Sequence, residues 1–213
     1  MHFMAFTRSL PLLVALAGAA LAQHGNAEID NQWVRVVRAK QAPHETLTLS
    51  PYYLVCLTDA RERITTKDGA SREVSWKPGD VIRLAATGQA EESLSDQPFE
   101  GVLIYLKPGA PKSPPIALDP VKLDPEHHIV VLEDDHVRAI RTILEPHLKS
   151  PEHEHPHYVV VYITELHTTM RLADGRTIDN PRRPGEIAWR DALKHVTENI
   201  GDHTAVEIQV ELK

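Results

Sequence analysis

The chain has 213 residues, a formal net charge of −7, thirteen histidines and one cysteine. A single cysteine excludes an intramolecular disulfide framework, and an acidic chain without a basic stripe argues against a nucleic-acid surface. The length is sufficient for one large domain or two small ones.

Residues 1–22 have the pattern of a secretory signal peptide. Arg8 supplies a positive start, residues 10–22 form an apolar run that is too short to span a bilayer, and Ala20-Leu21-Ala22 is a small-x-small cleavage signal. We expect the mature protein to begin at Gln23, to be secreted or periplasmic, and to keep no stable membrane anchor after cleavage.

The rest of the chain repeats itself. Residues 31–38 (NQWVRVVR) resemble residues 134–141 (DDHVRAIR), and the likeness continues along both copies. Further matching pairs are Pro43-His44 with Pro146-His147, Asp68-Gly69 with Asp174-Gly175, Pro78-Gly79 with Pro184-Gly185, and Leu106-Lys107 with Leu212-Lys213. From Asp68 onward the pairs keep one register without a gap, which indicates an internal duplication.

Both copies consist of strand patterns. Short β-branched or aliphatic runs occupy residues 33–38, 81–84 and 101–106, and again residues 128–132, 158–163 and 205–212. The two Asp-Gly dipeptides predict hairpin turns, because glycine tolerates the positive φ of a tight turn. No stretch has a sustained helical period, and we expect at most one helical turn, near residues 192–195. The pattern of each copy therefore predicts a small antiparallel barrel or sandwich.

A proline-rich segment separates the copies. Residues 107–125 hold six of the sixteen prolines of the chain. Such a segment is extended and cannot form a central strand. We place the boundary near Ser113, which divides the mature chain into domains at residues 23–112 and 113–213.

Histidines concentrate in the second copy. Ten of the thirteen follow residue 126, and the densest run is PEHEHPHY at residues 151–158. Alternate residues of a strand share a face, so His153, His155 and His157 would point the same way. Two imidazoles at this spacing can converge on one divalent metal ion. A surface histidine cluster without a physiological metal is the alternative interpretation.

The context of this run resembles the two-part signature of the cupin superfamily. HEHP at residues 153–156 fits the opening of the first motif, which is H-x-H and then, after three or four residues, Glu. PGEIAW at residues 184–189 and HVTEN at residues 195–199 fit the second motif, a Pro-Gly turn with a later His and Asn. The resemblance implies an all-β bicupin of two tandem jelly-roll β-barrels, with His153, His155 and His195 as metal ligands.

The sequence departs from the family pattern at the acidic ligand. The family's Glu would fall at Val159 or Val160, and strand parity predicts that Val159 faces the metal. Neither residue can ligate, so His157 is a further candidate ligand, unless it is an exposed residue near the barrel mouth. Three neutral imidazoles would leave a divalent ion its full charge and favour an anionic partner. The metal could be Fe, Mn, Zn, Ni or Cu, since the pattern does not select among them.

The first copy lacks these residues. Gln89 aligns with His195, and the segment around residues 49–51 aligns with HEHP, so we expect the first barrel to be structural.

Two hypotheses of function follow. The first is an exported bicupin that binds one divalent metal ion in the C-terminal barrel and acts as a metal-dependent oxygenase on a small organic molecule, with no catalytic residue identified beyond the metal ligands. The second is a non-catalytic module that binds a small ligand or a metal, which an interior plugged by Val159, Val161 and their neighbours would favour. Assembly into a homo-oligomer is left open by the sequence.

Overall fold

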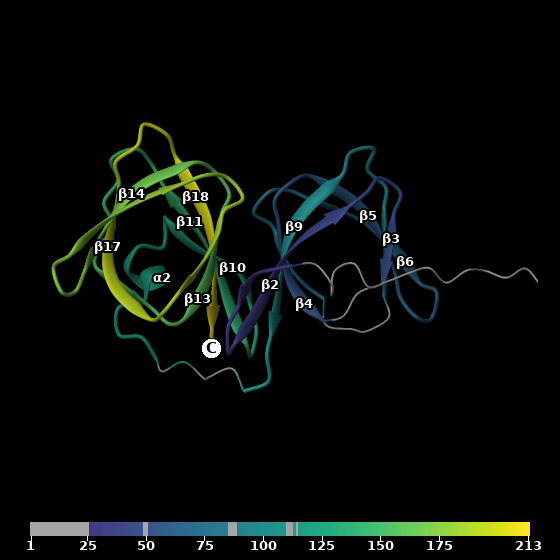
Figure 1. Cartoon of the computed structure of the whole chain (residues 1–213), viewed down its shortest axis with the longest axis horizontal. Coiled ribbons are helices and arrows are strands. Elements are labelled where there is room, and N and C mark those ends of the chain that lie inside the picture. The colour runs from purple at the N-terminus through teal and green to yellow at the C-terminus, as the bar shows by residue number, and fades with distance from the viewer. Residues whose placement is uncertain (1–25, 49–50, 85–88, 110–112, 114) are drawn as a thin grey trace, which may run out of the picture.

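The computed structural model describes the chain except residues 1–25, 49–50, 85–88, 110–112 and 114 (Figure 1). The expected signal peptide and its cleavage site lie outside the described residues. None of the helices in the described part of the chain is long and apolar enough to cross a membrane.

The first half is built from two antiparallel sheets. One has five strands in the order β1-β2-β9-β4-β7, and the other has four in the order β3-β8-β5-β6. The strand bounds are β1 (Ala27–Asp30), β2 (Val34–Gln41), β3 (Thr46–Thr48), β4 (Tyr52–Cys56), β5 (Ala60–Thr65), β6 (Ser71–Trp76), β7 (Val81–Leu84), β8 (Ala90–Ser93) and β9 (Phe99–Leu106).

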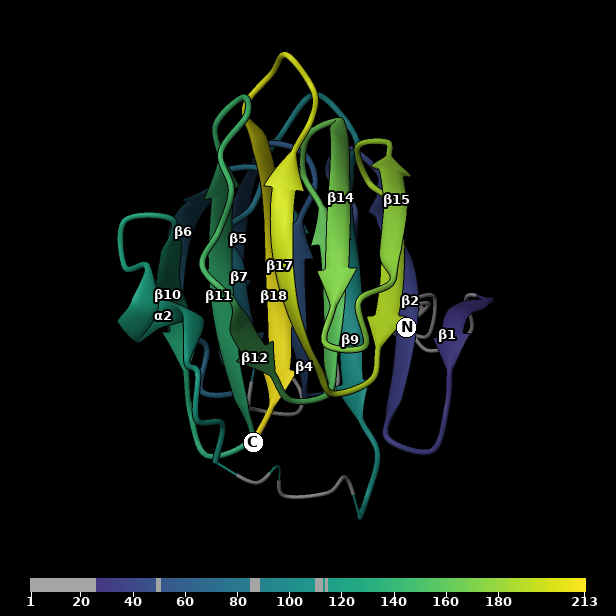
Figure 2. The same ribbon diagram turned by 90° about the vertical axis from the view of Figure 1, so that its left-hand side faces the viewer.

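The second half has the same two sheets in the same order. Its five-stranded sheet is β10-β11-β18-β13-β16. Its four-stranded sheet is β12-β17-β14-β15, which faces the viewer in Figure 2. The bounds are β10 (His128–Glu133), β11 (Val137–Leu144), β12 (His153–His155), β13 (Tyr158–Tyr162), β14 (Leu166–Leu172), β15 (Thr177–Arg182), β16 (Ile187–Arg190), β17 (Leu193–Asn199) and β18 (Ala205–Leu212). Each half is thus a two-sheet jelly roll, as the sequence predicted.

Backbone conformation repeats along with the sequence. His44 and His147, which align in the duplication, have φ values of 60° and 62°. They are the non-glycine residues with positive φ in the described part of the chain. Gly69 and Gly175 both have a φ of 85°, which the two Asp-Gly turns require and which a side chain would strain.

The proline-rich segment contains the short helix α2 (Pro120–Leu123), which the sequence analysis did not predict. Asp119 caps this turn by accepting a hydrogen bond from the Val121 amide, and Pro120 occupies the first turn, where its missing N–H costs nothing. The helical turn expected near residues 192–195 is absent, because β17 begins at Leu193 and pairs there with β12.

The two five-stranded sheets pack against each other and form one apolar core between the halves (Figure 1). Along β18, alternate side chains (Ile208, Val210 and Leu212) belong to this core, so the residues between them face the interior of the second half. The packing is close to two-fold symmetric. Arg38 donates to the Gly185 carbonyl at 2.7 Å, and its counterpart Arg141 donates to the Gly79 carbonyl at 3.0 Å.

Candidate metal centre

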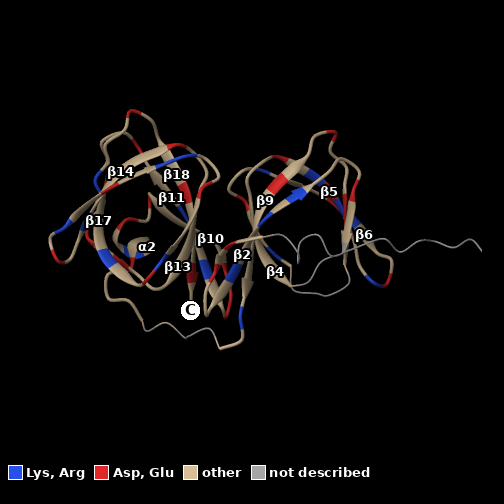
Figure 3. Ribbon diagram, in the orientation of Figure 1, with Lys and Arg blue, Asp and Glu red and all other residues tan. Residues whose placement is uncertain are grey.

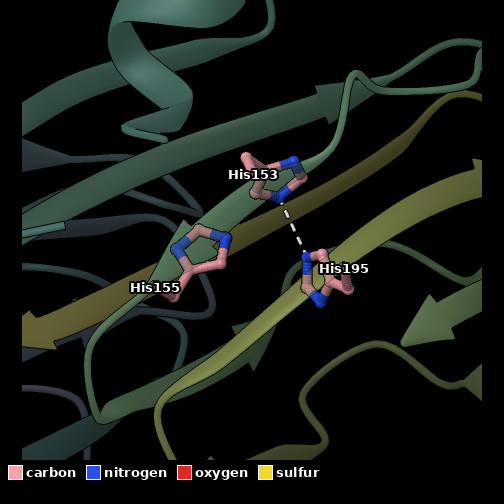
Figure 4. A group of neighbouring side chains, drawn as sticks. All are labelled: His153, His155 and His195. Atoms are coloured by element: carbon pink, nitrogen blue, oxygen red, sulfur yellow. Dashed lines mark hydrogen bonds between the residues drawn. The ribbon is translucent and has the colours of Figure 1, made fainter. Parts of the chain in front are cut away.

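Three histidines that are distant in sequence meet inside the second half. His153 and His155 lie on β12, and His195 lies on β17 directly opposite His153 in the antiparallel ladder. Their candidate ligand atoms all lie within 4.8 Å of one another, and the Nε2 atoms of His153 and His195 are 2.9 Å apart (Figure 4). We call these three residues the histidine triad.

Hydrogen bonds fix two of the three rings. His153 Nδ1 lies 2.8 Å from the Pro151 carbonyl oxygen, and His155 Nδ1 lies 2.7 Å from Oε1 of Glu211. Each Nδ1–H therefore donates, which leaves the Nε2 lone pair of both rings available. Nε2 of His155 and Nδ1 of His195 are buried and have no hydrogen-bond partner among the described residues.

Burial keeps the triad uncharged. Each of the three residues is 2% exposed. Loss of solvent lowers the pKa of every ring, and that of His155 lies well below its ordinary value, since the neighbouring histidines oppose a positive charge there as well. Neutral imidazole is the form that coordinates metals.

The triad therefore has the properties of a ligand set. Nε2 of His155 is buried without a partner in the described chain, at a cost in free energy that a metal ion would recover. Two nitrogen atoms 2.9 Å apart are also spaced like neighbouring ligands of one ion, given metal–nitrogen bonds of about 2.1 Å. The donor set suits a divalent first-row metal ion.

A series of linked charged groups lies behind His155, and no pattern in the sequence predicts it. Glu211 on β18 bonds His155 through one carboxylate oxygen and Arg138 through the other, at 2.7 Å. Arg138 in turn donates to Asp119, the cap of α2, at 3.0 and 3.1 Å. Such outer contacts orient metal-binding histidines. Burial raises the pKa of Glu211 to about 7, although Arg138 lowers it.

A fourth buried histidine borders the triad. His128, at the start of β10, is 2% exposed, and its ring centre lies 5.1 Å from that of His153. Its Nδ1 lies 3.2 Å from the carbonyl oxygen of Asp124. Nothing in the sequence marked this residue beyond the general excess of histidine after residue 126.

The structure does not bring His157 to the triad. Its side chain is 26% exposed, and its Nδ1 accepts a hydrogen bond from the Ala192 amide. The ring packs against both Trp33 of the first half and Trp189, with ring centres 4.3 and 5.7 Å away. His157 therefore takes part in the contact between the halves.

The expected orientation of Val159 is wrong. Val159 and Val161 belong to the core between the halves, whereas Val160 packs inside the second half with Tyr158 and Tyr162. Of the two positions where the family's Glu would fall, Val160 is therefore the one that can face the triad. It follows that Val159 and Val161 do not plug the interior.

A surface cleft of about 280 Å³ reaches the outer side of this network. Glu211, Arg138, Pro156 and Leu212 are among the residues that line it. Glu211 therefore connects the two, because it lines the cleft and bonds His155.

The first half has a different interior. Gln89, the counterpart of His195, is half-buried, and the interior is filled by an apolar cluster that includes Leu54 and Leu103. Two carboxyl groups, Glu62 and Glu91, are buried in it at 2% and 5% exposure. Burial raises the pKa of both, that of Glu91 to about 8.

Comparison with known proteins identifies the fold. No family model matches the chain, and no curated protein matches it in sequence. Among solved structures, AerE from Microcystis aeruginosa is similar at a TM-score of 0.61 and 10% identity, covering 84% of this chain and 88% of that one. A cupin 2 conserved barrel domain protein from Leptotrichia buccalis has a TM-score of 0.54 and 11% identity, covering 87% of this chain and 86% of that one.

A third similar structure is oxalate decarboxylase from Bacillus subtilis, a protein with Mn(II) centres. Its TM-score is 0.53 at 15% identity, with 84% of this chain and 68% of that chain covered. At such identities the likeness concerns the fold. Together with the duplicated jelly rolls, these comparisons show that the fold of this chain is that of the cupin superfamily in its two-domain form.

Proposed function

We propose that the second half binds one divalent first-row metal ion through His153, His155 and His195, and that the protein is a metal-dependent oxygenase of a small organic molecule. The observation that supports the metal site best is the cluster of buried, neutral imidazoles with nitrogen atoms that lack partners. Iron and manganese are the first candidates, and the similarity to a decarboxylase with Mn(II) centres favours manganese.

A set of three protein ligands suits catalysis, because it leaves coordination positions for a substrate. An iron or manganese ion held there would supply the redox chemistry of an oxygenation. The residues around it hold the ligands in place. Glu211 and the Pro151 carbonyl fix the His155 and His153 rings with Nε2 inward, and the buried interior excludes bulk water.

The substrate would approach through the cleft that ends at Glu211 and Arg138. The ion would keep its full charge among neutral imidazoles, so an anionic substrate is favoured.

We also propose that the protein is exported, with residues 1–22 removed as a signal peptide. Protein for the tests should therefore be isolated from the secreted or periplasmic fraction of its native host. Intact-mass measurement of this material should give a chain that starts at Gln23, and a full-length cytoplasmic species as the dominant form would contradict export.

The decisive test is metal content. Elemental analysis should find about one divalent ion per chain in the wild type and much less in His195→Ala, because a buried site cannot easily recruit another donor. His203→Ala, which changes an exposed histidine of the same half, is the matched control and should keep the metal. Equal metal in wild type and His195→Ala would contradict the site. A metal-loaded protein that consumes no oxygen with small carboxylates or enols would instead be a non-catalytic binding module.

A further inference from the structure

The five-stranded sheet of the second half faces the histidine triad, and its strand pairing locates the ion. This inference rests on the proposed metal site. His155 contacts two residues of that sheet, Glu211 at 2.7 Å and Tyr158 at 5.0 Å between ring centres. Glu211 on β18 and Tyr158 on β13 are cross-strand partners. His155 therefore stands over the row of the sheet that these two residues form.

His153 stands over a different row. Its ring lies against His128, which pairs with Thr142 on β11, and Thr142 pairs with Glu207 on β18. Glu207 and Glu211 are four residues apart on one strand, so their side chains share a face and are separated by one intervening row. From these two contacts we infer that the ligand atoms of His153 and His155 lie over that middle row.

The middle row contains one polar side chain. Gln209 on β18 pairs with Ile140 on one side and with Val160 on the other. Gln209 is 3% exposed, and its Nε2 donates to Oε1 of Glu207 at 2.7 Å, which fixes the carboxamide. Its Oε1 is buried and has no hydrogen-bond partner among the described residues. A buried oxygen without a partner, at this position, points to a cation.

We propose that Oε1 of Gln209 is the fourth protein ligand of the metal ion. Carbonyl oxygen suits hard divalent ions such as Mn²⁺. Gln209 is also the neighbour across the ladder of Val160, the position where the cupin resemblance places the family's Glu. Where the family pattern has a charged carboxylate on the strand equivalent to β13, this chain would thus use a neutral amide oxygen on β18.

Neutrality of the ligand set has a consequence for the substrate. Three imidazoles and one amide oxygen leave the ion its full charge, where a carboxylate would have cancelled one unit. Four protein ligands would still leave room on the ion for a substrate. The site therefore favours a small anion that offers two oxygen atoms, such as a carboxylate next to a hydroxyl or keto group, or an enolate.

Titration calorimetry of Mn²⁺ into the metal-free mature protein tests the assignment. Gln209→Leu removes the oxygen at similar volume, and we expect its dissociation constant to rise on the order of tenfold to a hundredfold. The matched control is Gln41→Leu, which changes a buried glutamine of the first half in the same way and should leave Mn²⁺ binding unchanged. Circular dichroism establishes that each variant is folded.

The visible absorption of bound Co²⁺ separates a ligand from a merely structural residue. The Co²⁺ spectrum should change in Gln209→Leu and stay unchanged in Gln41→Leu. Gln209→Glu keeps an oxygen donor and should bind Mn²⁺ at least as tightly as the wild type, which also covers the case in which the leucine variant does not fold. Unchanged affinity and spectrum in both Gln209 variants would overturn this ligand while leaving the triad intact. A wild type that binds no metal would overturn both proposals.

Discussion

The two halves of this molecule have the same strands, sheet order and turn conformations, yet their interiors have diverged. The outer faces of the five-stranded sheets are apolar in both halves, because they form the core between them. Inside, the second half has Thr142, Gln209 and Glu211 where the duplication places Ala39, Leu103 and Tyr105 in the first. In the described chain, the unpartnered buried nitrogens of the triad have no counterpart in the first half.

The duplicated fold contains two kinds of residue. Those between the halves hold the fold together in both copies, whereas those inside each half are free to differ. The residues between the halves must remain apolar and close in size, because each packs against the sheet of the other half. Charged residues are interspersed along the strands and loops of both halves, so surface charge does not distinguish them (Figure 3). What distinguishes them is the buried histidine triad of the second half, with nitrogen atoms that lack partners among the described residues and that are costly to bury unless a ligand satisfies them.

The largest change in stability should come from placing a carboxylate on either face of β13. Val159→Glu puts a carboxylate into the core between the halves, and Val160→Glu puts one beside the triad. Both should destabilise the metal-free protein by about 3–5 kcal/mol, because the charge is buried without a partner. Excess Mn²⁺ should stabilise Val159→Glu only as much as it stabilises the wild type, and should stabilise Val160→Glu by more, because only that carboxylate can reach the ion.

Thermal unfolding with and without Mn²⁺ measures this difference, with the wild type as the reference. An equal response of the two variants to Mn²⁺ would show that β13 does not separate the two environments in this way.

A smaller effect should come from the buried carboxyl of the first half. The pKa of Glu91 is about 8, raised mainly by burial from an ordinary value of 4.5. Between those values the unfolded chain releases a proton that the folded chain keeps, so the contribution of Glu91 to stability falls as pH rises from 4.5 through 8. Glu91→Gln should remove this loss and stabilise the protein at pH 8 by about 2 kcal/mol.

Urea unfolding at pH 8 and pH 4 tests the sign, because the gain should shrink at pH 4, where both states are largely protonated. Glu92→Gln is the matched control. Glu92 is a partly exposed neighbour paired with Arg63 at 2.7 Å, and its loss should cost about 0–1 kcal/mol at either pH. A Glu91→Gln gain that is equal at both pH values would mean that the benefit does not come from the proton.

The smallest effects should come from the two arginines that cross between the halves. Arg38→Met and Arg141→Met each remove one hydrogen bond to a glycine carbonyl, and each should cost about 1 kcal/mol. Arg38 also pairs with Glu28 at 2.6 Å, so its loss should be slightly the larger. Urea unfolding of both variants measures the symmetry of the interface. A large loss for one arginine and none for the other would contradict the two-fold arrangement.

The sequence alone determined the duplication, the β class and the three histidines of the triad. These are local patterns. Asp-Gly turns, short β-branched runs and H-x-H spacing can each be read from a few consecutive residues, and the repeat of the pattern set the register. His195 was found because HVTEN at residues 195–199 resembles the His and Asn of the second cupin motif, and the ladder then placed it opposite His153.

Only the tertiary structure decided which residues surround the triad. All five residues of β13 are buried, since one face meets the interior and the other meets the first half. Such a strand shows no alternation of polar and apolar residues, so parity alone could not decide between Val159 and Val160. His128, Gln209 and Glu211 come from strands far from the H-x-H run in sequence, and His157 lies on the outer side because Trp33 of the other half packs against it. Long-range packing set these positions, and no local pattern records it.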